Sequence, residues 1–285
     1  MIRRAFSLSL VLVSLAVVLG AQSSVERSIL VTVLDKDGAP LRDLKPSDFI
    51  IQEDGQRREV VSAVLATEPM SVALLIDTSK PSMGTEFPVR DVRNGLAAIV
   101  NAISADNPQS EVSLMDYAGA AVKTVNYTNN GDQILKSINR LIVNQRSYGV
   151  LLEGLIDTGK DLQKVKNARR AIVVVGFDAP DSSATQPREA AMAVQKSGAA
   201  FWAVAVGNNS SAARDVIFEN LPPITGGVRV TMQTATGLVS ALEKIGAALT
   251  AQYVVTYKRP GGAAASTIQA GATRGDKVLR ASLIR

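Results

Sequence analysis

The chain has 285 residues, of which 46% are hydrophobic, 20% are charged and 4% are aromatic, and its formal net charge is +5. A chain of this length and apolar content can bury one large core, or a medium domain with a small companion, so bulk disorder is excluded. The sequence contains no histidine and no cysteine. These absences exclude the Ser-His-Asp triad, thiol nucleophiles and zinc held by His or Cys, and leave carboxylate, hydroxyl, lysine and hard-cation chemistry.

The N-terminus, residues 1–21, has the pattern of a secretory signal. Arg3 and Arg4 precede an apolar run at 6–19 that ends in two small residues, Gly20 and Ala21. The run has about 14 residues, whereas a membrane-spanning helix needs about 20. We therefore expect cleavage near Gln22 and export to the periplasm or the medium, with an uncleaved anchor as the alternative.

The basic residues do not indicate a nucleic-acid partner. Without Arg3 and Arg4 the formal charge falls to +3, and the remaining basic residues are scattered along the chain. Neither a stripe of positive charge that could follow phosphates nor an aromatic stacking platform is visible.

Residues 22–66 predict a small β module. Its strand-like runs lie at 29–34, 49–53 and 59–65, with Asp37-Gly38 and Asp54-Gly55 between them. Each Asp-Gly pair can supply the positive φ angles that a tight hairpin turn needs.

Residues 67–258 predict an α/β domain with a doubly wound, mostly parallel sheet. Strand-like runs lie at 70–76, 112–117, 171–175, 200–206 and 253–257, and segments with apolar residues three and four apart lie at 92–103, 134–141, 151–162 and 238–249. Near-continuous apolar strands indicate a sheet that is covered on both faces. The alternation indicates a parallel sheet with helices on both sides.

The remaining residues, 259–285, combine a loop with a strand. Residues 261–275 are rich in Gly and Ala and predict a flexible loop, whereas 277–284 regain strand character. We expect this last strand to pair with 253–257 or with the N-terminal β module.

The first core strand ends in a polar segment, Ile76-Asp77-Thr78-Ser79-Lys80-Pro81-Ser82-Met83. With the alternation around it, this segment resembles the von Willebrand factor A domain, whose metal-ion-dependent adhesion site begins with Asp-x-Ser-x-Ser. The resemblance covers roughly 67–258, and the β module and 249–257 are similar to related exported proteins of soil bacteria. It implies non-enzymatic binding of a protein or cell-surface ligand by the loops after Ile76, Tyr117, Leu141 and Val175, at the carboxyl ends of the strands.

The resemblance also implies a site for a hard divalent cation, usually Mg²⁺, held by oxygen ligands. It assigns four residues of this chain to that site: Asp77, Ser79, Ser82 and Asp178. The match is partial, because Lys80-Pro81 places one extra residue before Ser82 and Asp178 matches only with a shift of one residue.

A further departure concerns the family's threonine ligand. Its position falls near Gly149, which leaves Ser147 as the nearest hydroxyl. Two alternatives stay open: a degenerate Mg²⁺ site, or a metal-free site in which the ammonium group of Lys80 takes the electrostatic role of the ion beside Asp77.

The sequence also suggests two other functions. The segments 75–79 and 155–159 both resemble the Asp-Thr-Gly/Ser signature of aspartic proteases, in which two carboxylates share a proton. Asp157, however, lies in a helical pattern, and α/β alternation does not build the two β lobes of that enzyme. The other alternative is a structural subunit of an exported assembly, with an inert carboxyl edge, that associates through the β module.

Overall fold

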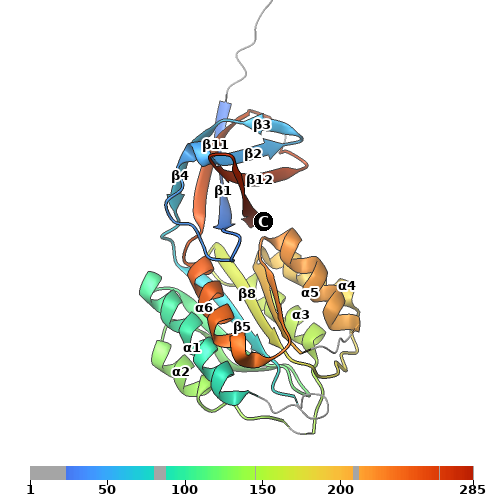
Figure 1. Cartoon of the computed structure of the whole chain (residues 1–285). Helices are drawn as coiled ribbons and strands as arrows, with labels where there is room; N and C mark the ends of the chain where they lie inside the picture. The colour runs from blue at the N-terminus through green and yellow to red at the C-terminus, as the bar shows by residue number, and fades with distance from the viewer. Residues whose placement is uncertain (1–23, 80–87, 145, 208–211, 263, 285) are drawn as a thin grey trace, which may run out of the picture.

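The structure is a computed structural model that describes residues 24–79, 88–144, 146–207, 212–262 and 264–284. The predicted signal at 1–21 and the inserted residues Lys80 and Pro81, with Ser82, lie outside the described residues. The described chain forms two β-sheets, one of them wrapped in helices (Figure 1).

The helix-covered sheet has six strands in the order β10-β9-β8-β5-β6-β7. Their bounds are β5 Met70–Ile76, β6 Glu111–Asp116, β7 Val122–Thr128, β8 Arg169–Gly176, β9 Ala200–Val206 and β10 Arg229–Met232. All neighbours are parallel except the antiparallel pair β6 and β7. Every residue of β5 and β9 is buried, as expected for strands covered on both faces.

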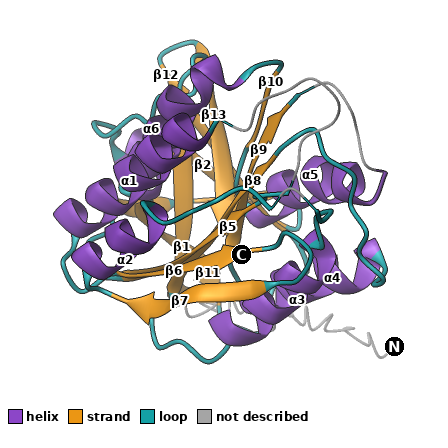
Figure 2. Ribbon diagram, turned by 90° about the horizontal axis from the view of Figure 1, so that it is seen from below, coloured by secondary structure: helices purple, strands orange, loops and turns teal. Residues whose placement is uncertain are grey.

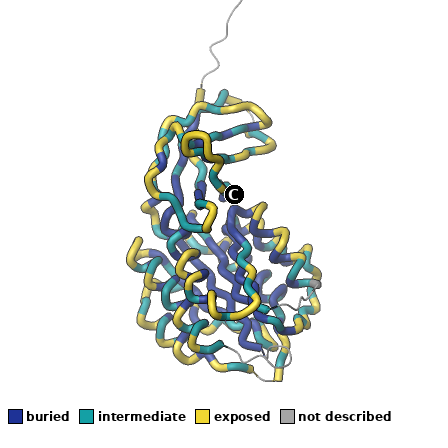
Figure 3. The backbone as a smooth tube through the Cα atoms, in the orientation of Figure 1, coloured by how far each residue is buried: buried dark blue, intermediate teal, exposed yellow. Residues whose placement is uncertain are grey.

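Helices cover both faces of this sheet. Their bounds are α1 Val89–Asp106, α2 Gly131–Ile138, α3 Leu151–Leu162, α4 Pro187–Ser197, α5 Ala212–Thr225 and α6 Leu238–Leu249. Figure 2 shows α1, α2 and α6 on one side of the strands and α3, α4 and α5 on the other. A hydrophobic core lies on each side, and buried backbone runs through the strands between them (Figure 3). The predicted doubly wound α/β fold is confirmed.

The second sheet is antiparallel and joins the two ends of the chain. It has seven strands in the order β3-β2-β12-β13-β1-β11-β4. Their bounds are β1 Ser24–Leu34, β2 Phe49–Glu53, β3 Gln56–Arg58, β4 Val60–Leu65, β11 Tyr253–Pro260, β12 Ile268–Arg274 and β13 Lys277–Ile284, and two short 3-10 helices lie at Pro46–Asp48 and Ala235–Gly237. Asp54 and Gly55 both have positive φ in the turn between β2 and β3, as predicted.

Two expectations about the C-terminal part need correction. The strand at 253–257 forms, but as β11 it pairs antiparallel with β1 and β4 and is not part of the parallel sheet. Its buried residues alternate along the strand, which is typical of a sheet with one covered face. Part of the predicted loop at 261–275 is the strand β12, which pairs with β2 and β13. The pairing of the last strand with the N-terminal module is confirmed by β13 and β1.

The guanidinium group of Arg169 holds the two sheets together. This buried side chain at the start of β8 donates to the backbone oxygens of Ala66, Glu68 and Leu249 at 3.3, 2.6 and 2.9 Å, and to Oε1 of Gln252 at 3.1 Å. One side chain therefore binds the connection that leaves β4, the end of α6 and the start of β11. No helix of the described chain is long and apolar enough to cross a membrane.

We predict that Arg169→Leu lowers the free energy of unfolding by about 3 kcal/mol or more, because buried carbonyl oxygens lose their donors. Urea denaturation of the purified protein measures the change. Arg188→Leu is the control, since Arg188 is an exposed arginine in the first turn of α4. Equal stabilities of the two variants would contradict the role given to Arg169.

Candidate functional site

The carboxyl ends of three neighbouring strands bring the predicted site together. Parallel pairing sets Ile76 at the end of β5 beside Asp116 of β6 and Val175 of β8. In Figure 1 this edge of the sheet lies at the bottom of the molecule, at the far end from the antiparallel sheet. The residues that follow these strands therefore gather at one edge, where ligands of α/β folds bind.

Asp77 is the buried acid of this edge, with only 3% of its surface exposed. Its Oδ1 accepts hydrogen bonds from the backbone N–H of Ser79 at 2.9 Å and from the hydroxyl of Ser79 at 2.5 Å. Burial raises the pKa of Asp77 to about 6, against the opposing effects of the two Ser79 bonds and of the charge on Arg214. Asp77 and Ser79 of the predicted set thus lie in contact.

A second carboxylate, Asp116, lies beside them. Its Oδ2 accepts from the hydroxyl of Thr78 at 2.6 Å and its Oδ1 from the backbone N–H of Ala118 at 3.0 Å. Burial raises the pKa of Asp116 as well. The sequence analysis did not single out Asp116, although a carboxylate at the end of an apolar strand was a signal that could have found it.

Gly149 lies where the resemblance places the family's threonine. A Cβ atom built on Gly149 would be 3.4 Å from Oδ2 of Asp77 and 3.4 Å from Cε2 of Tyr117. The position beside Asp77 therefore has no hydroxyl. The buried Oγ of Ser147, the nearest hydroxyl in the sequence, makes no hydrogen bond with any part of the chain that the structure describes.

Asp178, the fourth residue of the predicted set, follows β8. A Cβ atom built on Gly207 would lie 2.3 Å from the Cβ atom of Asp178. Gly207 also has a φ of +105°, so only glycine fits at this position. Oδ1 of Asp178 is buried without a hydrogen-bond partner among the described residues. In that same part of the chain, Asp178 forms no hydrogen bond with Asp77 or Ser79, and its place in a shared site stays a prediction.

The loop that contains Asp178 is anchored to the start of α3. Asp181 accepts from the backbone N–H of Leu151 at 3.1 Å, and Ser183 accepts from that of Leu152 at 3.0 Å. The backbone of Gly149 also bonds to Pro180 and Ser182 at 3.1 and 2.7 Å. These contacts satisfy free N–H groups of a helix start and hold two loops of the edge in place.

Arg214 supplies a positive charge that the sequence analysis missed. This buried arginine lies in the first turns of α5, and its Nη1 donates to the backbone oxygen of Phe177. The centre of its guanidinium group is 6.0 Å from the ring centroid of Phe218. Its charge acts on Asp77, where it lowers the pKa of the carboxyl group.

The residues described at this edge do not make up a divalent-cation shell by themselves. Oδ1 of Asp77 is occupied by Ser79, Gly149 has no hydroxyl, and a guanidinium group provides positive charge nearby. The described residues hold no group of three or more carboxylates that could bind a metal ion. Ser82 and Lys80 lie outside the described residues, so their predicted roles stay predictions.

The raised pKa of Asp77 predicts a pH-dependent cost. The folded state binds this proton more tightly than the unfolded state does. Asp77 therefore does not lower the free energy of unfolding below pH 3.8, and it lowers that free energy in full above pH 6. In chelator, Asp77→Asn should become more stable relative to wild type by about 2 kcal/mol as the pH rises from 4 to 7.

Urea denaturation at each pH measures this difference, and Asp157→Asn controls for the loss of an exposed carboxylate on α3. A wild type that instead gains stability over Asp77→Asn with rising pH would show that the ionised carboxylate is fully compensated.

Comparison with known proteins identifies the family of this chain. The family model of the von Willebrand factor type A domain matches residues 71–222. No curated protein matches the chain. The fold is similar to that of proximal thread matrix protein 1 from the mussel byssus in a form with a zinc-occupied MIDAS motif, at 13% identity and a TM-score of 0.55, over 70% of this chain and 49% of that chain. This chain therefore spans about half the length of the byssus protein.

Two bacterial structures are also similar. A von Willebrand factor type A protein from Catenulispora acidiphila matches at 11% identity and a TM-score of 0.53, over 93% of this chain and 74% of that one. The von Willebrand factor domain of a type V pilus tip protein from Porphyromonas gingivalis matches at 11% identity and a TM-score of 0.51, over 64% and 95%. At these identities the structures establish the fold alone. Because the family model matches more than half of the sequence, the chain belongs to the von Willebrand factor type A domain family.

Proposed function

We propose that the chain is an exported, non-enzymatic binding protein that recognises a protein or cell-surface ligand through the loops at the carboxyl edge of its parallel sheet. The observation that carries this proposal is a pair of exposed apolar side chains on the loop between α2 and α3, at that edge. Ile142 is 76% exposed and Tyr148 is 57% exposed. Exposed apolar residues beside a rigid polar cluster are typical of sites for protein partners.

The loop that presents Ile142 and Tyr148 is held on both sides of the edge. The backbone N–H of Asn144 donates to Thr78 at 2.8 Å, and the backbone oxygen of Tyr148 accepts from Gly119 at 2.7 Å. These two hydrogen bonds fix Asn144 and Tyr148 before a partner arrives, which lowers the entropic cost of binding. The pilus tip and byssus matrix proteins named above support an adhesive role by analogy of fold.

The chemistry of the edge supports binding over catalysis. The sequence has no histidine or cysteine to serve as base or nucleophile. The two Asp-Thr segments considered for a protease are separate, because Asp77 follows β5 whereas Asp157 is exposed on the surface of α3. A carboxylate pair that shares one proton requires the two groups to lie side by side.

Recognition at this edge is proposed to be independent of a divalent ion. Arg214 offsets the charge of Asp77 from within the protein. The inserted Lys80 belongs to the same loop as Ser79 in the sequence and is proposed to add to this effect. Isothermal titration calorimetry should detect no specific Mg²⁺ or Mn²⁺ binding to the wild type. Micromolar binding that is lost in Asp77→Ala would restore the family's adhesion site.

The binding face is tested by capturing partners from the exported fraction with the chain from residue 22 onward. We expect Ile142→Ser with Tyr148→Ser to abolish capture, and chelator to leave wild-type capture unchanged. The matched control is Val64→Ser with Val278→Ser in the antiparallel sheet, whose side chains are 58% and 86% exposed. Capture lost only in this control would overturn the proposal and support the alternative, a scaffold subunit that assembles through the β module.

A further inference from the structure

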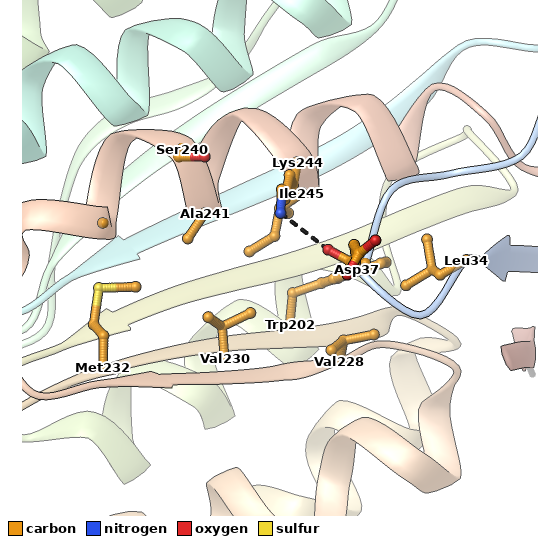
Figure 4. Close-up of a pocket in the computed structure, with 12 residues that line it drawn as sticks. Leu34, Asp37, Trp202, Val228, Val230, Met232, Ser240, Ala241, Lys244 and Ile245 are labelled. Carbon is orange, nitrogen blue, oxygen red and sulfur yellow. Dashed lines mark hydrogen bonds between the residues drawn. The ribbon is translucent and has the colours of Figure 1, made fainter.

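A cavity of about 290 Å³ lies where the two sheets meet. Figure 4 shows it between α6, the edge strand β10 with its neighbour β9, and the turn that follows β1. Half of its twelve lining residues have large apolar side chains: Leu34, Trp202, Val228, Val230, Met232 and Ile245. The residues of the carboxyl-edge cluster described above are not part of this wall.

The interior of the cavity is suited to an apolar ligand. Trp202, Leu34 and Ile245 are buried and belong to the core cluster on the α6 side of the sheet. Apolar walls of this kind favour apolar molecules over water, because water finds too few hydrogen-bond partners there. A cavity about half this size holds benzene, so this one accommodates an apolar molecule of about a dozen non-hydrogen atoms.

The mouth of the cavity carries a positive charge. Nζ of the exposed Lys244 donates to the backbone oxygen of Asp37 at 2.9 Å, which links α6 to the turn after β1 (Figure 4). The carboxylate of Asp37 is paired with Nζ of Lys36 at 3.4 Å. Within the described chain, Lys244 therefore has no carboxylate partner, and the ammonium group keeps donors for a ligand.

The turn also carries two carboxylates, Asp35 and Asp37, which have partners of their own. Oδ1 of Asp35 is occupied by the backbone N–H groups of Asp37 and Ala39, both at 2.8 Å. The mouth thus combines an available cation with the hydroxyl of Ser240, an exposed residue one turn away on the same helix.

We propose that this junction cavity binds an apolar carboxylate, whose tail packs against Trp202 and Val230 and whose head pairs with Lys244. Such a ligand contacts the α/β unit and the turn of the antiparallel sheet at once. By mass action it stabilises the folded chain in which these two parts are joined. The site is separate from the carboxyl edge and does not depend on the function proposed for it.

The sole tryptophan of the sequence is in the cavity wall, so its fluorescence reports occupancy directly. The full chain from residue 22 is titrated with decanoate below its micellar concentration, and in parallel with decan-1-ol. We expect a saturable change with decanoate. Lys244→Met should weaken decanoate binding by about tenfold, as for loss of a partly exposed charged hydrogen bond, and leave decan-1-ol binding unchanged.

Two further variants separate the site from general effects. Lys196→Met removes an exposed lysine at the end of α4 and should leave both titrations unchanged. Gly237→Phe places a ring at the cavity wall, where a Cβ on Gly237 meets no atom within 4 Å, and should abolish both. No saturable change in wild type would overturn the proposal. So would equal loss of decanoate and decan-1-ol binding in Lys244→Met, or binding that survives Gly237→Phe.

Discussion

The carboxyl edge of the parallel sheet depends on one constraint, the burial of Asp77 at the end of a wholly buried strand. An ionised carboxylate in such a place is costly unless hydrogen bonds or a positive charge compensate it. Ser79 supplies two donors and Arg214 supplies a charge from α5. Gly149 leaves no side chain between Asp77 and Tyr117. These groups offset only part of the cost of burial, because the pKa of Asp77 stays raised.

The second constraint is the joining of two sheets built from distant parts of the chain. β1 pairs with β11 across more than two hundred residues, and the α/β unit is inserted between them. Leu34 and Ile284 of the antiparallel sheet extend into the core beneath α6, and Arg169 ties the connecting segments. The cavity beside Trp202 lies at this junction. The carboxyl edge lies at the opposite end of the strands, so the molecule presents two separate surfaces.

Sequence reasoning succeeded where the local signal was strong. The continuous apolar runs at Met70–Ile76 and Ala200–Val206 have the predicted bounds, and Gly149 does lie beside Asp77. It failed where pairing is distant or the signal is weak. The apolar residues of β11 are compatible with either sheet, and only its pairing with β1 and β4 assigns it to the antiparallel one. The Ala and Gly residues of β12 favour a loop, but its pairing with β2 makes it a strand. Arg214 reaches back thirty-seven residues to Phe177, and no pattern in one sequence marks that contact.

We propose that positive charge from the protein, with Arg214 at its centre, takes the place of the family's divalent ion at Asp77. The most direct test is a crystal structure of the chain from residue 22, grown with Mn²⁺ and measured at the manganese absorption edge. We expect no anomalous peak at Asp77, with Oδ1 still bound by Ser79 and the guanidinium group of Arg214 in place. A peak at about 2.2 Å from a carboxylate oxygen of Asp77, the distance of a direct metal–oxygen bond, would contradict it.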